Sequence, residues 1–346
     1  MVKLVDTPAL GAGTARYESS SLSSPTKKFF VNFIRNFRDI TKHDVALAGG
    51  KGASLGEMTR AGIPIPPGFV VLSIAYDRFL EEAHLIAEID SQLHGVDLEN
   101  VHTVESASET IQALIMQASM SKDLGAEILE ALEILDVEFV AVRSSATAED
   151  SASGAWAGQL DSYLNTPKVQ VIENVKRCFA SLFTPRAIFY RHEQGLHDHH
   201  ISVAVVVQNM VESEKSGVAF SVHPVTEDRN QLIIEAGFGL GEAIVSGQIT
   251  PDSYVIEKEP RRVIEVDVHT QTRGLYRATA GGNAWRELSL SEGEARVLSD
   301  AEVLELSEIV VNIERHYGFP CDIEWAFAGE HFYIVQSRPI TTLTTN

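Results

Sequence analysis

The chain has 346 residues, of which 44% are hydrophobic and 22% charged, a composition that indicates a globular protein with a sizeable core and excludes bulk disorder. Its net charge of −20 excludes a broad electrostatic grip on DNA or RNA, because such binding needs clustered positive charge. No apolar run is long enough to span a membrane, and the two cysteines give neither a disulfide framework nor zinc-ligand spacing. We therefore expect a cytoplasmic protein that binds neither nucleic acid nor membrane.

Residues 1–28 differ from the rest of the chain, because they are poor in apolar residues and have no period. This composition predicts a disordered tail. The stretch also resembles the conceptual translation of a tRNA gene, so a gene-calling artefact is the alternative interpretation.

The first 200 residues carry mainly helical patterns. They predict, in chain order, a loop leading into a helix (45–60), a rigid turn (64–68), a short buried strand (69–72), a mostly helical region (74–136), a strand ending in a polar loop (139–143) and further helices (168–196).

Strands dominate the rest of the chain. The patterns predict a central β-branched strand (201–210), two further strands (217–221 and 231–235), a hairpin (252–267), a helix (291–316) and a closing hairpin. Helices first and mixed sheet second predict an α+β fold with two lobes, rather than a doubly wound parallel sheet. We place the N-terminal lobe at 29–200 and the C-terminal lobe at 201–346.

Glycines surround Lys51 in the segment Gly49–Gly52. Glycines let backbone N–H groups approach a phosphate, a helix N-terminus adds a favourable dipole, and Lys51 would add a positive charge. The segment is not a Walker A loop, because Lys51 is followed by Gly rather than by Ser or Thr. It predicts either a phosphate-binding loop or a purely structural turn.

Arg143 follows an apolar strand and precedes two serines. Sites in α/β proteins commonly lie at strand ends, and an arginine next to hydroxyl groups suits a planar anion such as phosphate. The alternative is a surface loop in which Arg143 pairs with Glu149 or Asp150.

The closing hairpin carries polar residues on one face of each strand. Asp322 and Glu324 alternate with apolar residues, and Gln336 and Arg338 share one face of the return strand. A three-residue loop would place Glu324 opposite Gln336 and would also pair the two outer residues, a cluster that suits magnesium-bound polyphosphate. A two-residue turn would place Glu324 opposite Val335 instead. The alternative is an edge hairpin with solvated charges.

A glycine-rich segment runs from Glu235 to Glu242 after a predicted strand. Its glycines do not match the dinucleotide-binding pattern, because Glu242 takes the place of the last glycine. A tight turn is the prediction, and a contact to substrate or phosphate is the alternative.

Taken together, these motifs resemble a known family. The segments are VALAGGKGASLGEMTRAGIPIPPGFVV, FVAVRSSATAEDSASGAWAGQLDSYLN, SGVAFSVHPVT, EAGFGLGEAIVSGQITPDSYVI and DIEWAF with FYIVQSRPI, in this order. They resemble the N-terminal nucleotide-binding domain of phosphoenolpyruvate synthase, pyruvate phosphate dikinase and rifampicin phosphotransferase, over roughly residues 29–343.

The resemblance implies an ATP-grasp fold that holds ATP and Mg²⁺ between two lobes. By motif position, Lys51, Arg143 and Arg338 would bind the phosphates and serve the chemistry. Glu324 and Gln336 would hold magnesium and phosphate.

The resemblance further implies contacts to the rest of the nucleotide. Gly158 and Ser162 would belong to a loop over the nucleotide. Gln208 would lie at the inter-lobe hinge beside the adenine.

In this family the ATP domain passes a phosphoryl group to a histidine on a separate domain with a Thr-Ser-His-Ala motif, and this sequence contains no such string. We therefore expect a phosphotransferase domain or subunit that needs a phosphohistidine domain in trans, with pyruvate or another acceptor bound elsewhere. The chain would be a fragment or a natural split subunit. The alternatives are the ATP domain of a rifampicin phosphotransferase, a non-catalytic nucleotide-binding module, and a carboxylate–amine ligase, for which we find no acceptor site.

Overall fold

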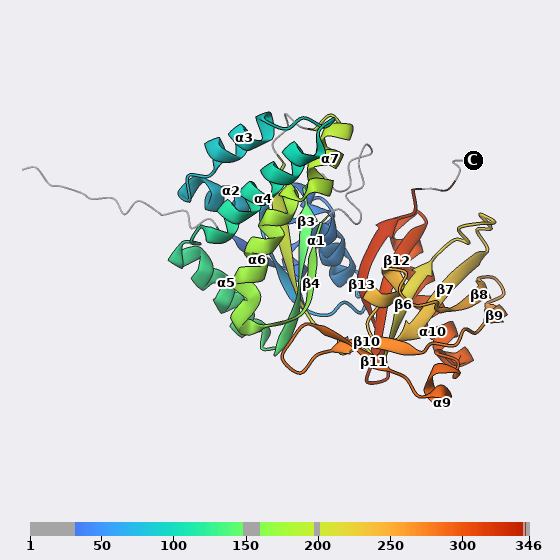
Figure 1. Cartoon of the computed structure of the whole chain (residues 1–346). Coiled ribbons are helices and arrows are strands. Elements are labelled where there is room, and N and C mark those ends of the chain that lie inside the picture. Colours follow the sequence, from blue (N-terminus) through green and yellow to red (C-terminus); the bar gives the residue numbers. More distant parts are fainter. Residues whose placement is uncertain (1–31, 148–159, 197–200, 342, 344–346) are drawn as a thin grey trace, which may run out of the picture. The chain divides into compact units, whose positions relative to one another are not determined.

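The computed structural model of the chain describes residues 32–147, 160–196, 201–341 and 343. The chain divides into the units Met1–Asn32 and Phe33–Asn346, and the helices and strands labelled in Figure 1 all belong to the second unit. The tail expected over 1–28 lies outside the described residues, as do the predicted site residue Gly158 and the candidate ion-pair partners Glu149 and Asp150.

The first sheet has five strands in the order β1-β2-β5-β3-β4, and all neighbours are antiparallel. The bounds are β1 (Ile34–Asn36), β2 (Gly68–Val71), β3 (Phe139–Ala146), β4 (Ser162–Pro167) and β5 (Val203–Asn209). The β-branched run of β5 forms the central strand, as its composition predicts. We expected residue 201 to begin the second lobe, but this pairing places β5 in the first sheet, so the chain leaves that sheet only after Asn209.

Most helices pack with the first sheet. They are α1 (Val45–Arg60), α2 (Ser73–Glu82), α3 (Ile86–His94), α4 (Val101–Gln117), α5 (Lys122–Leu135), α6 (Val171–Ala180) and α7 (Pro185–Glu193), with short 3-10 turns at Phe37–Asp39, Lys168–Gln170 and Ser181–Phe183. Apolar side chains of α2 to α7 share one core with Val203, Val205 and Val207. The helix expected over 168–196 is broken before Pro185, which can begin a helix but cannot continue one.

The second sheet has six strands in the order β13-β12-β6-β7-β8-β9. The bounds are β6 (Lys215–Phe220), β7 (Gln231–Phe238), β8 (Asp252–Glu257), β9 (Arg262–Asp267), β12 (Cys321–Ala328) and β13 (His331–Pro339), with helices α8 (Glu242–Val245), α9 (Leu290–Gly293) and α10 (Asp300–Tyr317). The apolar side of α10 packs on this sheet in a second core.

The helix expected over 291–316 is two helices. A capping box formed by Ser299 and Glu302 begins α10. Just before it, the Val297 N–H donates to the Asp252 carboxylate at 2.8 Å. Side chains therefore take over the backbone groups that a continuous helix would have paired internally.

A small hairpin, β10 (Arg273–Arg277) and β11 (Asn283–Glu287), forms a separate two-stranded sheet. The sequence did not predict it, because its residues are mostly exposed or half-buried and its alternation is weak. The sequence patterns also did not predict β1, because this strand has only three residues. The predicted α+β class is confirmed. Within the described part of the chain, no helix is long and apolar enough to cross a membrane.

Candidate functional site

The glycine segment forms a kink inside α1. Gly49 has φ 66°, and a Cβ built on it would lie 2.2 Å from the Ser145 carbonyl oxygen, so only glycine fits there. The Ser145 hydroxyl donates to the Ala48 carbonyl at 3.0 Å and accepts from the Gly52 N–H at 3.2 Å. We expected a loop leading into a helix, but the segment is a kink within α1. The residues on either side of the kink, Ala48 and Gly52, are both hydrogen-bonded to Ser145 of β3.

Lys51 follows this kink and is half-buried. Burial raises the pKa of the Cys178 thiol to about 12, and the positive charge of Lys51 counteracts that effect only in part. A raised pKa favours the protonated thiol at neutral pH. Lys51 therefore brings a positive charge to the region where α1 meets the first sheet.

Arg143 lies inside β3 rather than at the end of a strand. The strand continues to Ala146, because Ser144 and Ser145 keep their backbone pairing with β5. The Arg143 side chain is buried, whereas the surface-loop alternative required it to be exposed.

The Arg143 guanidinium reaches the closing hairpin. Its Nη1 donates to the Val335 carbonyl at 2.8 Å, and its Nη2 donates to Gln336 Oε1 at 2.6 Å. The same Nη2 lies 3.5 Å from Glu324 Oε2. The structure thus brings together three of the predicted site residues, which are separated by up to 193 positions in the chain.

The hairpin reaches the expected register by an unexpected route. Its turn has two residues, because Ala328 pairs directly with His331. A bulge then adds Val335 to the return strand, so that Glu324 pairs with Gln336. Of the two alternatives left open by the sequence, the turn has two residues, yet the pairing of Glu324 with Gln336 that we had tied to a three-residue loop is present.

The outer residues of the hairpin form an ion pair. Arg338 Nε and Nη2 lie 2.8 and 2.7 Å from Asp322 Oδ2. The Arg338 side chain is 43% exposed, whereas that of Asp322 is only 12% exposed. Asp322 therefore orients a guanidinium that still faces solvent, from which an anion can approach.

Sequence analysis missed one acidic residue on the same sheet face. Glu235 lies within β7 and pairs with Val218, which in turn pairs with Glu324. Directly opposed residues point to one face of a sheet. Burial raises the pKa of Glu235, and the negative charge of Asp322 raises it further. The available signal was a glutamate closing an apolar strand, which we had treated as the start of a turn.

Two other predicted residues lie on the first sheet. Gln208 is buried in β5, and its Nε2 donates to the Pro66 carbonyl at 3.3 Å. Ser162 is the first residue of β4 and pairs with Arg143. Gln208 therefore lies one residue before the point where the chain leaves the first sheet, and Ser162 lies beside the arginine.

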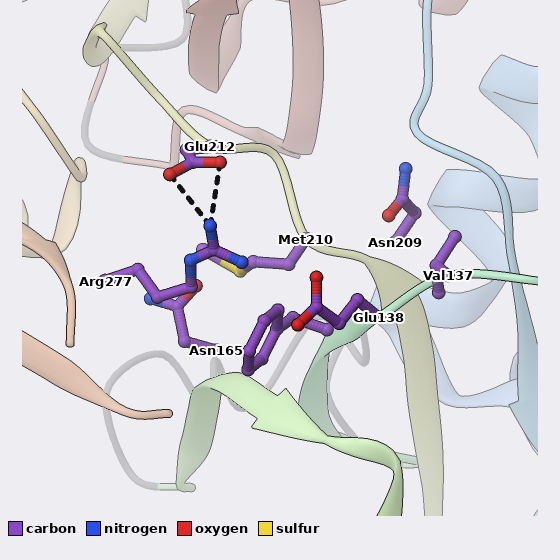
Figure 2. Close-up of a pocket in the computed structure, with 8 residues that line it drawn as sticks. Val137, Glu138, Asn165, Asn209, Met210, Glu212 and Arg277 are labelled. Atoms are coloured by element: carbon purple, nitrogen blue, oxygen red, sulfur yellow. Dashed lines mark hydrogen bonds and ion pairs between the residues drawn. The ribbon is translucent and has the colours of Figure 1, made fainter. Parts of the chain in front are cut away.

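A cavity of about 250 Å³ opens where the chain leaves β5 (Figure 2). Its lining residues are Val137, Glu138, Phe139, Asn165, Asn209, Met210, Glu212 and Arg277. Phe139 and Arg143 are four positions apart on β3, so their side chains point to the same face of the sheet. None of the lining residues was a candidate from sequence, because they come from four separate segments.

The side-chain oxygens of Glu324 and Gln336 are potential donors to a divalent metal ion. Among the residues that the structure describes, no three acidic, histidine or cysteine side chains gather as a metal cluster. Glu324 and Gln336 offer two oxygen donors beside Arg143. Mg²⁺ at phosphate sites is commonly held by one or two carboxylates, with phosphate oxygens and water completing the shell. The donors therefore fit a magnesium ion carried by polyphosphate better than an all-protein cage.

Residues 45–346 match the family described as pyruvate phosphate dikinase, AMP/ATP-binding domain. Over 325 residues the chain is 44% identical to a probable phosphoenolpyruvate synthase of Methanocaldococcus jannaschii, covering 92% of the chain and 27% of that relative. It is 46% identical over 311 residues to a probable phosphoenolpyruvate synthase of Archaeoglobus fulgidus, covering 88% and 41%. It is 36% identical over 315 residues to rifampicin phosphotransferase of Bacillus subtilis, covering 90% and 36%. The chain thus spans less than half the length of each of these relatives.

Proposed function

The chain belongs to the pyruvate phosphate dikinase AMP/ATP-binding domain family, and on this premise we propose that it binds Mg·ATP where Arg143 meets the closing hairpin. The observation that carries the proposal is the 2.6 Å hydrogen bond from the buried Arg143 to Gln336, with Glu324 beside it. A buried cation next to two oxygen ligands is an arrangement that suits a phosphate and its metal ion.

Each predicted site residue then has a role. Lys51, Arg143 and Arg338 bind phosphate oxygens, and they supply local positive charge in a chain whose net charge is −20. Glu324 and Gln336 hold magnesium, which when bound neutralises phosphate charge and polarises the transferred group.

The rest of the nucleotide extends along the first sheet. We call the cavity of Figure 2 the hinge cavity and assign the base to it. Its lining residue Phe139 lies on the Arg143 side of β3, about 13 Å along the strand from Arg143 at roughly 3.3 Å per residue. Gln208 lies in the adjacent strand β5 next to this end, and Ser162, which pairs with Arg143, lies at the phosphate end.

The group transferred from ATP passes to a histidine on a separate domain or chain. Two observations support this part of the proposal: the sequence lacks a Thr-Ser-His-Ala string, and the relatives named phosphoenolpyruvate synthase are more than twice as long as the matched region. If the pyrophosphoryl group moves to the histidine, AMP leaves, and hydrolysis by water then releases the γ-phosphate as inorganic phosphate and leaves the β-phosphoryl group on the histidine. Pyruvate or another acceptor is bound elsewhere. The similarity to rifampicin phosphotransferase makes an antibiotic the second candidate acceptor.

Thermal unfolding tests ATP binding. Mg·ATP at 100 times its Kd adds about 2.7 kcal/mol to the free energy of unfolding, which gives a measurable rise in Tm. A folded sample whose Tm does not move with millimolar Mg·ATP contradicts the proposal.

Radiolabelled ATP tests the acceptor. We expect no stoichiometric label on this chain alone and an acid-labile label on an added phosphohistidine domain. Stoichiometric acid-labile label on this chain itself would show that one of its own histidines is the acceptor.

A further inference from the structure

The small hairpin β10–β11 touches both large sheets. On the side of the second sheet, Leu240 N–H donates to the Leu275 carbonyl at 2.8 Å. On the side of the first sheet, Gly282 N–H donates to the Asn165 carbonyl at 3.0 Å. The Asn165 side chain in turn donates to Asn283 Oδ1 at 2.8 Å. The hairpin is therefore a non-covalent link between the two sheets.

The covalent link beside it is the connecting segment, residues 210–214, which runs from β5 to β6. Arg277, the last residue of β10, holds this segment: its Nη2 donates to both carboxylate oxygens of Glu212 at 2.9 Å (Figure 2). The Arg277 guanidinium also lies 4.4 Å from the centre of the Phe139 ring. One side chain thus joins the small hairpin, the connecting segment and β3.

All three of these residues line the hinge cavity. The planar guanidinium can stack on an aromatic ring with its face while its edge donates hydrogen bonds. The start of the connecting segment is already tied to β3, because the Met210 N–H donates to the Phe139 carbonyl at 3.1 Å. The contacts of Arg277 add a second tie, which holds the Glu212 end of the segment relative to the Phe139 ring. The Arg277 side chain is 29% exposed and that of Glu212 is 75% exposed, so the ion pair alone contributes little to global stability.

We propose that Arg277 is a positioning residue that sets the width of the hinge cavity and thereby the affinity for the base of the nucleotide. This inference rests on the proposed function, because it takes ATP as the ligand and the cavity as the base site. Arg277 acts on the base end only, since the phosphate-binding residues Arg143 and Gln336 are held by separate contacts.

The test compares Mg·ATP with Mg·tripolyphosphate, which has the phosphates but no base. In Arg277→Gln, Kd for Mg·ATP should rise about fivefold, because the cavity wall is no longer held in position before the ligand arrives; this fold-change corresponds to about 1 kcal/mol. Kd for Mg·tripolyphosphate should change by less than about twofold. Glu212→Gln should also raise Kd for Mg·ATP, but by less than Arg277→Gln, because the Arg277 guanidinium still stacks on the Phe139 ring.

Arg286→Gln is the matched control. Arg286 lies on the same hairpin, stacks 4.2 Å from the Tyr276 ring and donates to Tyr276 Oη at 2.9 Å, but it does not line the cavity. This variant should bind both ligands as the wild type does.

The outcomes separate the inference from the proposed function. Equal weakening of both ligands, an unchanged Kd for Mg·ATP, or failure of both Arg277→Gln and Glu212→Gln to fold overturns the positioning role. A wild-type protein that binds neither ligand overturns the proposed function itself, and the inference with it.

Discussion

Glu324 and Gln336 lie directly opposite each other on β12 and β13, although a turn of only two residues joins the strands. A regular two-residue hairpin would place Val335 opposite Glu324. The bulge removes Val335 from that position and leaves its carbonyl for Arg143 Nη1, at 2.8 Å. One local irregularity therefore aligns the two oxygen-bearing side chains and connects the hairpin to the first sheet.

Replacing Gly49 by alanine should destabilise the fold by about 3 kcal/mol or more, from positive-φ strain and overpacking together. The new Cβ would lie 2.2 Å from the Ser145 carbonyl oxygen. Gly62 is the matched control, because it also has positive φ but nothing within 4 Å. Gly62→Ala should cost only about 1 kcal/mol. Urea unfolding measures both values, and equal losses would show that the contact with β3 does not constrain the kink.

Arg143→Lys should weaken Mg·ATP binding roughly 30-fold, because lysine cannot replace both hydrogen bonds and about 2 kcal/mol is lost. Isothermal titration calorimetry measures the change in Kd. Arg262→Lys is the control, since Arg262 is 65% exposed on the edge strand β9 and pairs with Glu257. Wild-type affinity in Arg143→Lys would remove this arginine from the site.

Glu324→Gln keeps the shape of the side chain and removes its charge. In the presence of ATP, the magnesium concentration for half-saturation should rise at least about tenfold, because a metal ligand is weakened. Binding of ATP without magnesium should not weaken, since a negative charge facing the phosphates is gone. The same loss of affinity with and without magnesium would contradict a metal-binding role. Glu265→Gln, on the exposed strand β9, controls for the change in net charge.

Glu235 should make stability depend on pH. Burial, and then the charge of Asp322, raise its pKa above the ordinary value of 4.5. Near pH 4 the carboxyl is mostly protonated in both the folded and the unfolded chain, so Glu235→Gln should resemble the wild type. As the pH rises through the raised folded pKa, the unfolded chain releases the proton more readily and the wild type loses stability relative to the variant.

Urea unfolding without magnesium, at both pH values, measures this difference. The free energy of unfolding of Glu235→Gln should exceed that of the wild type at neutral pH, and the gap should close on acidification. A gap that widens on acidification would mean that the environment of Glu235 favours the charged form.

Local patterns predicted much of the fold. The helices over 74–136, the buried strand β2 and the central strand β5 follow from period and composition, because their apolar residues must face a core. The small hairpin and the break before α10 were not predictable in this way. Their backbone partners, such as Asp252 for Val297, come from distant segments of the chain.

The sequence by itself determined which residues are candidates for binding phosphate and metal: a lysine among glycines, an arginine before two serines, and two oxygen-bearing side chains on facing strands of a hairpin. Only the tertiary structure decided how they meet. The register of Glu324 and Gln336 depends on a bulge, and the contact of Arg143 with Gln336 spans 193 positions. The periodicity of apolar residues predicts on which face of its own helix or strand a side chain lies. It does not predict which elements come into contact, because that depends on packing between segments that are far apart in the chain.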